Sequence, residues 1–285
     1  MTSKTRAELF LLLITVIWGS TFVITKNAVA TTSPLMFMSI RFGLASLLFL
    51  IFFYKKIDLD FRKVSTAGLG VGLTMLIGFA CQTVGLKHTT ASNSGFITGL
   101  LVIFTPIFQI IIERKWPKKG TIIGVILVTV GLYLLVNPGG VGSNTFYGDF
   151  LTLICAISFA IYIVLLDIAS KKDNLYTLTF IQMLITAIGG VILSVFVEDI
   201  VVVFDMNLVI SAVYLAVFAT IAATFIQTKY QKDTTPAKAA VIFTMEPVFS
   251  AILAFLVLGE VIGVMGILGG MIIVTGLLLS ELSKS

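Results

Sequence analysis

The chain has 285 residues, of which 58% are hydrophobic and only 12% are charged. A water-soluble protein of this length needs a larger charged fraction to cover its surface, so the composition excludes a soluble enzyme and a soluble nucleic-acid-binding protein. The net charge of +5 therefore needs another explanation, which the placement of the basic residues supplies.

Ten apolar segments follow one another along the chain. Each is about 17–22 residues long, which is the length that a helix needs to cross the hydrocarbon layer of a membrane. We predict membrane-spanning helices at residues 9–29, 35–54, 66–86, 91–112, 120–136, 147–166, 175–196, 208–227, 237–258 and 263–280. These helices use nearly the whole chain, so the sequence predicts an all-α integral membrane protein without a separate soluble domain.

The beginning of the chain also fits a second interpretation. Lys4 and Arg6 precede the first apolar segment and residues 28–30 (Ala-Val-Ala) follow it, as in a secretory signal peptide. Cleavage would remove the first predicted span and leave the sixth span without a counterpart. We therefore favour an uncleaved first helix.

The basic residues lie mostly on one side of the predicted membrane. All but three of the 19 Lys and Arg residues occur at the two termini or beside the loops that follow even-numbered spans. The exceptions are Lys26, Arg41 and Lys87. An excess of Lys and Arg marks the cytoplasmic loops. We therefore expect a multi-pass protein of the cytoplasmic (plasma) membrane with both termini in the cytoplasm, and no nucleic-acid partner.

The second half of the chain repeats features of the first half. Residues 89–95 resemble residues 234–240, and residues 104–108 resemble residues 245–249. Each half holds five predicted spans, and because five is odd, the second copy must be inverted relative to the first. Inverted repeats with matched, proline-interrupted helices are typical of secondary transporters.

The boundary between the two halves is a segment rich in glycine and proline. Such residues end a helix and turn the chain. We predict a first repeat at 1–136, a Gly/Pro linker at 137–146 and a second repeat at 147–285, with the two repeats arranged around a central cavity.

Several short motifs occur in a fixed order along the spans. They are residues 18–23 (Trp-Gly-Ser-Thr-Phe-Val), Arg41-Phe42, Pro106, Glu246-Pro247 and residues 258–260 (Leu-Gly-Glu). In this order they resemble the EamA family of the drug/metabolite transporter (DMT) superfamily, over essentially the whole chain. The resemblance implies ten helices in two inverted five-helix repeats and transport of amino acids or other small metabolites, commonly outward. One departure is that Lys115 stands in the first half where the second half has Glu260.

Two ionisable residues, Arg41 and Glu246, lie well inside the predicted spans and away from their ends, where charge is costly and often functional. Arg41 could hold a substrate carboxylate through a bidentate contact, or it could be a structural residue that extends to the interface or caps helix carbonyls. Glu246 lies just before Pro247 and could line the cavity and exchange protons, or it could bond to a carbonyl that the proline leaves free. We expect a cavity-lining Glu246 and leave proton coupling open.

Polar residues of the two halves are paired by the repeat. Inversion should place Arg41, Gln82 and Asn93 toward the outer face, and their counterparts toward the inner face. The counterparts are Gln182, Gln227 and Lys238. We interpret the six residues as two clusters at opposite ends of one cavity, although Asn93 and Lys238 could simply begin helices.

The sequence therefore gives a set of candidate substrate-binding residues and two helix breaks that could serve gating. The candidates are Trp18, Arg41, Gln82, Asn93, Gln109, Tyr162, Gln182, Gln227 and Glu246, and the helix breaks are Pro106 and Pro247. No metal site is expected because His88 is the only histidine and metal sites need clustered ligands. No cofactor is expected either, and the chain has no phosphate-binding motif for ATP-driven pumping.

Together these features predict a secondary transporter of small polar metabolites, most simply amino acids or relatives, that works by alternating access and exports its substrate. The expected partners are a small-molecule substrate and the lipid bilayer, and the oligomeric state is left open. The alternative is a flippase for a lipid-linked substrate. A membrane-embedded enzyme is disfavoured because the ionisable groups well inside the spans, Arg41 and Glu246, are few and lie at different depths.

Overall fold

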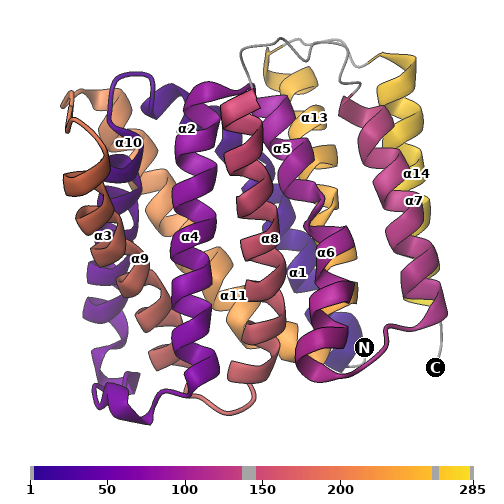
Figure 1. The fold of residues 1–285 in the computed structure, drawn as a ribbon, viewed down its shortest axis with the longest axis horizontal. Helices are drawn as coiled ribbons and strands as arrows, with labels where there is room; N and C mark the ends of the chain where they lie inside the picture. The colour runs from indigo at the N-terminus through magenta and orange to yellow at the C-terminus, as the bar shows by residue number, and fades with distance from the viewer. Residues whose placement is uncertain (1–2, 137–145, 259–262, 283–285) are drawn as a thin grey trace.

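The computed structural model describes residues 3–136, 146–258 and 263–282, and these residues form a bundle of helices (Figure 1). The predicted linker 137–146 lies almost wholly outside the described residues, as do Gly259 and Glu260 of the last sequence motif. The α-helices are α1 (Ser3–Gly19), α2 (Thr21–Ala28), α3 (Pro34–Phe53), α4 (Thr66–His88), α5 (Ala91–Gly99), α6 (Leu101–Phe108), α7 (Lys119–Val136), α8 (Phe146–Ala169), α9 (Leu175–Val197), α10 (Met206–Tyr214), α11 (Ala223–Tyr230), α12 (Pro236–Phe243), α13 (Met245–Leu258) and α14 (Val264–Leu282). Within the described ranges there is no β-strand.

Seven helical stretches of the described chain are long and apolar enough to cross a membrane. They are Lys4–Ala28, Pro34–Lys56, Thr66–His88, Asn93–Glu113, Phe146–Ala169, Leu175–Val197 and Met206–Asp233. Two shorter apolar helices cover Lys119–Leu135 and Val264–Ser280, and α12 and α13 together cover the predicted span 237–258. The protein is thus an all-helical, multi-pass membrane protein.

Four predicted spans contain an irregularity that the sequence did not locate. One is divided at Ser20, another at Leu100 and a third at Thr244, while the eighth contains a π-helix, Leu215–Ala222. The hydroxyls of Ser20 and Thr244 donate to carbonyls three residues earlier, at 2.7 Å and 2.6 Å, so they compete with the regular helical ladder.

The break in the fourth span lies away from Pro106, which corrects the expectation for that residue, whereas the break in the ninth span, at Thr244, lies three residues before Pro247. Pro106 lies inside α6, six positions after the break at Leu100, and is followed by a π-helical turn, Gln109–Glu113. Pro247 lies in the first turn of α13. A proline is tolerated there because the first backbone N–H groups of a helix have no intrahelical partner.

Pairs of helices that are far apart in sequence pack along much of their length. α3 packs against α9, α4 against α8, and α7 against α14 (Figure 1). In the last pair, a Cβ atom added to Gly131 would lie only 2.7 Å from the carbonyl oxygen of Gly269. Such small residues let two helix backbones approach closely where lipid supplies no hydrophobic driving force.

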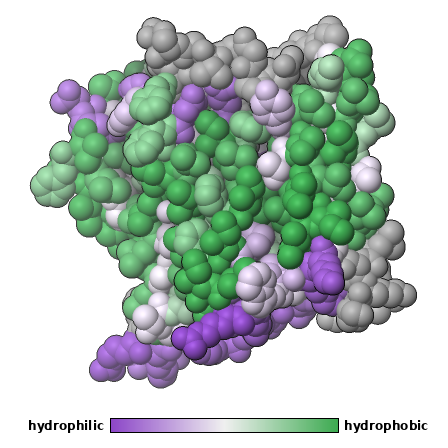
Figure 2. All heavy atoms as spheres, turned by 45° about the vertical axis from the view of Figure 1, so that its right-hand side comes forward, coloured by the Kyte–Doolittle hydropathy of each residue, from purple (hydrophilic) through white to green (hydrophobic). Residues whose placement is uncertain are grey.

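One end of the bundle is strongly hydrophilic. α1 begins and α14 ends at this end, which is the lower edge in Figure 1. Figure 2 shows a hydrophilic band along the same edge and mostly apolar side chains above it. The exposed lysines Lys55 and Lys56, in a 3-10 turn after α3, and Lys171, in the turn after α8, lie at this end, so basic residues gather as the sequence pattern predicts.

Candidate functional site

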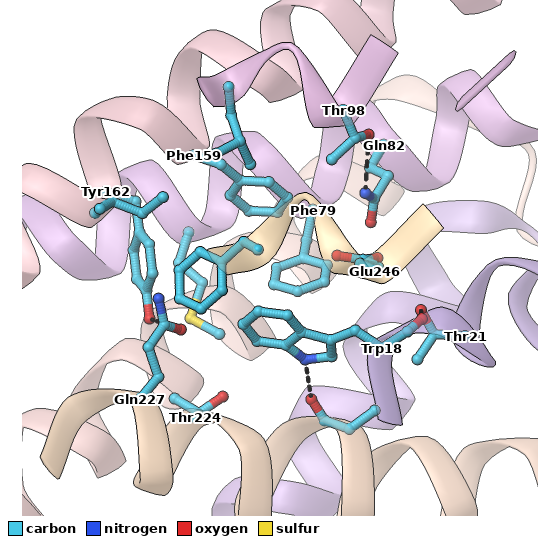
Figure 3. Close-up of a pocket in the computed structure, with 15 residues that line it drawn as sticks. Trp18, Thr21, Phe79, Gln82, Thr98, Phe159, Tyr162, Thr224, Gln227 and Glu246 are labelled. Atoms are coloured by element: carbon cyan, nitrogen blue, oxygen red, sulfur yellow. Dashed lines mark hydrogen bonds between the residues drawn. The ribbon is translucent and has the colours of Figure 1, made fainter. Parts of the chain in front are cut away.

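A central cavity of about 70 Å³ lies between helices of both halves of the chain (Figure 3). It has room for a few water molecules in the described conformation. The lining residues are Trp18, Thr21, Met75, Phe79, Gln82, Thr98, Leu101, Phe159, Tyr162, Ile163, Ala219, Thr224, Gln227, Phe243 and Glu246.

Aromatic side chains form much of the cavity wall. Trp18 meets Phe243 edge to face with ring centroids 5.3 Å apart, and Phe79 meets Phe159 in the same way at 5.1 Å. Trp18 Nε1 also donates a hydrogen bond of 3.3 Å to the carbonyl oxygen of Ala219, which lies in the π-helix. The π-helix therefore helps to fix the orientation of the indole ring.

Two glutamines, Gln82 and Gln227, occupy opposite ends of the cavity (Figure 3). Gln82 lies in the last two turns of α4 and donates to Thr98 Oγ1 at 3.3 Å. Gln227 lies near the end of α11, at the opposite end of the bundle, and its Oε1 is 3.3 Å from the hydroxyl of Tyr162. Both ends of the cavity thus present amide groups that can donate and accept hydrogen bonds.

A buried hydrogen-bond network extends from the Gln227 end toward the basic end of the bundle. The hydroxyl of Tyr162 lies 2.9 Å from Gln182 Oε1, and Gln182 Nε2 donates to Thr228 at 3.0 Å. Gln227 Nε2 donates to Gln231 at 2.9 Å, and Gln231 in turn donates to a backbone carbonyl of α8. Because the tyrosine hydroxyl carries one proton, it donates to only one of its two glutamine neighbours at a time.

Glu246 is the one carboxylate among the residues that line the cavity. It lies in the first turn of α13, where the helix dipole favours a negative charge. Within the described part of the chain, no donor lies within hydrogen-bonding distance of this carboxylate. Its oxygens are therefore available to a ligand in the cavity, and they do not bond to a carbonyl beside Pro247.

The chain matches known proteins along almost its whole length. The model of the EamA-like transporter family matches residues 5–137 and again residues 146–282. The chain belongs to the EamA-like transporter family. It is therefore a membrane transporter, which implies a small-molecule substrate and a bilayer environment.

Individual relatives agree with this family. An uncharacterised transporter of Archaeoglobus fulgidus is 33% identical over 278 residues, which cover 97% of this chain and 86% of the relative. The uncharacterised transporter YyaM of Bacillus subtilis is 26% identical, with 91% and 88% of the two chains covered. A solved structure described only as the crystal structure of a protein has the same fold, with a TM-score of 0.83, 14% identity, and 98% and 97% coverage.

Four of the candidate residues of this EamA-like transporter lie outside the cavity lining. They are Arg41, Asn93, Gln109 and Gln182. Gln182 is fully buried and is hydrogen-bonded to the lining residue Tyr162. Gln109 Oε1 accepts a hydrogen bond of 3.0 Å from the backbone N–H of Ala237, so it caps the first turn of α12.

Arg41 lies directly behind the cavity wall. Its guanidinium carbon is 5.1 Å from the ring centroids of both Phe42 and Phe79, and its Nε donates to Thr220 Oγ1 at 2.8 Å. The residue is only 6% exposed, so it does not extend to the interface. Arg41 connects the lining residue Phe79 with the π-helix Leu215–Ala222.

The two expected polar clusters form only in part. Gln82 reaches the cavity, but Asn93 is half-buried in the first turn of α5 and does not line it. Gln182 and Gln227 meet through Tyr162, whereas Lys238 pairs with Glu8 at 2.8 Å. Glu8 directly precedes the first predicted span in the sequence.

Several lining residues are not among the candidates predicted from the sequence, although helical spacing points to two of them. Phe79 precedes Gln82 by three positions and Thr224 precedes Gln227 by three, so each lies on the same helix face as its glutamine. Thr98 has no comparable signal. The part of the chain that the structure describes contains no group of three potential metal-ligating side chains.

Proposed function

We propose that this EamA-like transporter is a secondary transporter of the plasma membrane that exports small polar metabolites, chiefly amino acids or their relatives, by alternating access. The observation that carries the proposal is the cavity between the two halves, which combines one carboxylate, two matched glutamines and an aromatic wall. The Lys and Arg residues that gather at the termini and after the even-numbered predicted spans support placing both termini in the cytoplasm.

The chemistry of the cavity favours a substrate with an ammonium group. The face of Trp18 attracts a cation, and the Glu246 carboxylate can accept charge-assisted hydrogen bonds from it. Gln82 and Gln227 can form hydrogen bonds to the carboxylate or amide of the same molecule, whether the cavity is open to the outside or to the cytoplasm. In this proposal Arg41 positions Phe79 and the π-helix, and Gln182 positions Tyr162.

The packing of the helices supports two inverted repeats, residues 1–136 and 147–285, joined by the segment 137–146. In the proposed repeat, α1 corresponds to α8 and α4 corresponds to α10 and α11. α8 packs against α4, and equivalently α1 packs against α11. α8 also packs against α6, as α1 does against α13. Rocking of one repeat against the other would then open the cavity to one side at a time.

Counterflow in proteoliposomes tests the proposal. Vesicles that hold the purified protein are loaded with unlabelled amino acids, one chemical class at a time, and uptake of the same labelled amino acid is measured. We expect uptake that exceeds empty vesicles for at least one class, and a parallel series with an imposed pH gradient tests proton coupling. Absence of counterflow for every soluble amine and amino acid, together with translocation of a labelled lipid-linked sugar, would instead establish the flippase.

A further inference from the structure

A second hollow of the molecule lies on its lipid-facing side, between α3 and α9. These two helices lie side by side at the left of Figure 1. The groove has a volume of about 330 Å³, and Gly43 forms part of its floor. A Cβ atom added to Gly43 would meet nothing within 4 Å, so the space above this glycine is open.

The groove presents an apolar surface to the bilayer. Leu47 is 56% exposed at one wall and Ile188 is 52% exposed at the other. Ser39 and Ser46 also line the groove, but each hydroxyl donates to the carbonyl four residues earlier at 2.7 Å. Their hydrogen-bonding capacity is therefore largely satisfied within α3, and the groove suits a hydrocarbon chain.

The length of the groove matches one leaflet of a bilayer. On α3 the lining extends from Ser39 to Leu50, which is about 16 Å at the helical rise of 1.5 Å per residue. The hydrocarbon core of a bilayer is about 30 Å thick, so one leaflet contributes about half of this. A single acyl chain that enters from one interface would fill the groove.

Two lysines lie where the groove reaches the basic end of the bundle. Tyr176 continues the groove-facing side of α9, one turn before Phe180, and its ring is 5.4 Å from that of Phe53 on α3. Lys56 Nζ lies 5.0 Å from the centroid of the Tyr176 ring and 3.3 Å from its hydroxyl. Lys55 is exposed beside it, and neither lysine has a carboxylate within 4.0 Å among the described residues.

We propose that the groove between α3 and α9 binds an anionic phospholipid, with one acyl chain along Gly43 and the phosphate at Lys55 and Lys56. Basic sites between membrane helices at the interface are suited to anionic head groups. The charge favours a lipid over a second copy of this chain, since a copy packed in the same orientation would bring two more lysines to the same end. The site does not depend on the transported substrate.

Native mass spectrometry of the purified protein tests this site with dioleoyl phosphatidylglycerol and dioleoyl phosphatidylcholine, which share their acyl chains. The wild-type protein should retain phosphatidylglycerol more strongly, and the Lys55→Gln/Lys56→Gln variant should lose this preference by about five-fold or more. Gly43→Leu should reduce retention of both lipids because its side chain fills the groove. Inorganic phosphate alone should give no adduct.

Gly270→Leu is the matched control, because a Cβ atom at this glycine of α14 also meets nothing within 4 Å. It should bind both lipids as the wild type does, and the melting temperatures of all variants without lipid verify that they are folded. Equal retention of the two lipids by the wild type, or equal binding by Gly43→Leu and Gly270→Leu, would overturn the proposal. A lipid-free dimer that Gly43→Leu abolishes would assign the groove to a second copy.

Discussion

A substitution at Glu246 can test substrate binding without changing the stability of the fold. Glu246→Gln keeps the shape of the side chain but removes the carboxylate that faces the cavity. We expect at least a ten-fold loss of counterflow, because one charge-assisted contact contributes about 1.5–3 kcal/mol. The melting temperature should change little, since no described donor depends on this carboxylate. Unchanged transport by a folded Glu246→Gln variant would remove Glu246 from the proposed site.

A substitution at Tyr162 allows a similar test at the end of the cavity where Gln227 lies. Tyr162→Phe deletes the hydroxyl that lies between Gln182 and Gln227, and we expect a loss of about 1 kcal/mol of stability with a several-fold rise in the KM for transport. Tyr214→Phe is the control, because it loses a hydrogen bond of 2.8 Å to Ser20 outside the cavity lining. Equal effects of the two substitutions on KM would contradict a substrate contact at Tyr162.

The contact between α1 and α13 is the element on which the position of Glu246 depends. A Cβ atom at Gly19 would lie 3.0 Å from the backbone nitrogen of Ser250 and 3.1 Å from the carbonyl oxygen of Glu246. Backbone atoms cannot yield as a flexible side chain can, so Gly19→Ala should destabilise the protein by about 1–3 kcal/mol and displace α13. Gly270→Ala has open space and should stay within about 0.5 kcal/mol of wild type. Denaturation of both variants in the same detergent measures the difference.

The helices, their breaks and the cavity lining differ in how well the sequence predicts them. Hydrophobic length predicts the helices well, because crossing the bilayer imposes that length on any sequence. The break positions at Ser20 and Thr244 were not predicted, since a hydroxyl that bonds back to its own helix is common and bends it only in some contexts. For the cavity, the polarity or position of Trp18, Gln82 and Glu246 in the sequence predicts that they line it. Arg41 instead lies behind Phe79. The sequence does not predict this, because packing decides which face of a helix meets the cavity.

At the scale of the whole molecule, the proposed topology places the hydrophilic edge of the bundle in the cytoplasm. Green fluorescent protein fused after residue 285 should therefore fluoresce, whereas alkaline phosphatase fused at the same place should be inactive. Fusions within the segment 137–145 should show the opposite behaviour, since it follows an odd number of proposed spans. An active phosphatase at the C-terminus would reverse the orientation and with it the assignment of inner and outer ends.

The ion pair between Glu8 and Lys238 joins the two halves at the hydrophilic end. The side chains are 9% and 6% exposed and lie 2.8 Å apart, and Lys4 is 4.0 Å from the same carboxylate. Removing one partner leaves the other charge buried, which costs about 3–5 kcal/mol, whereas replacing both removes that penalty. We therefore expect Glu8→Gln and Lys238→Met each to lower stability more than the double variant does, with a coupling energy of about 1–3 kcal/mol in thermal or denaturant unfolding. Additive effects would mean that Lys4 or solvent compensates each charge separately, and the pair would then not hold the two halves together.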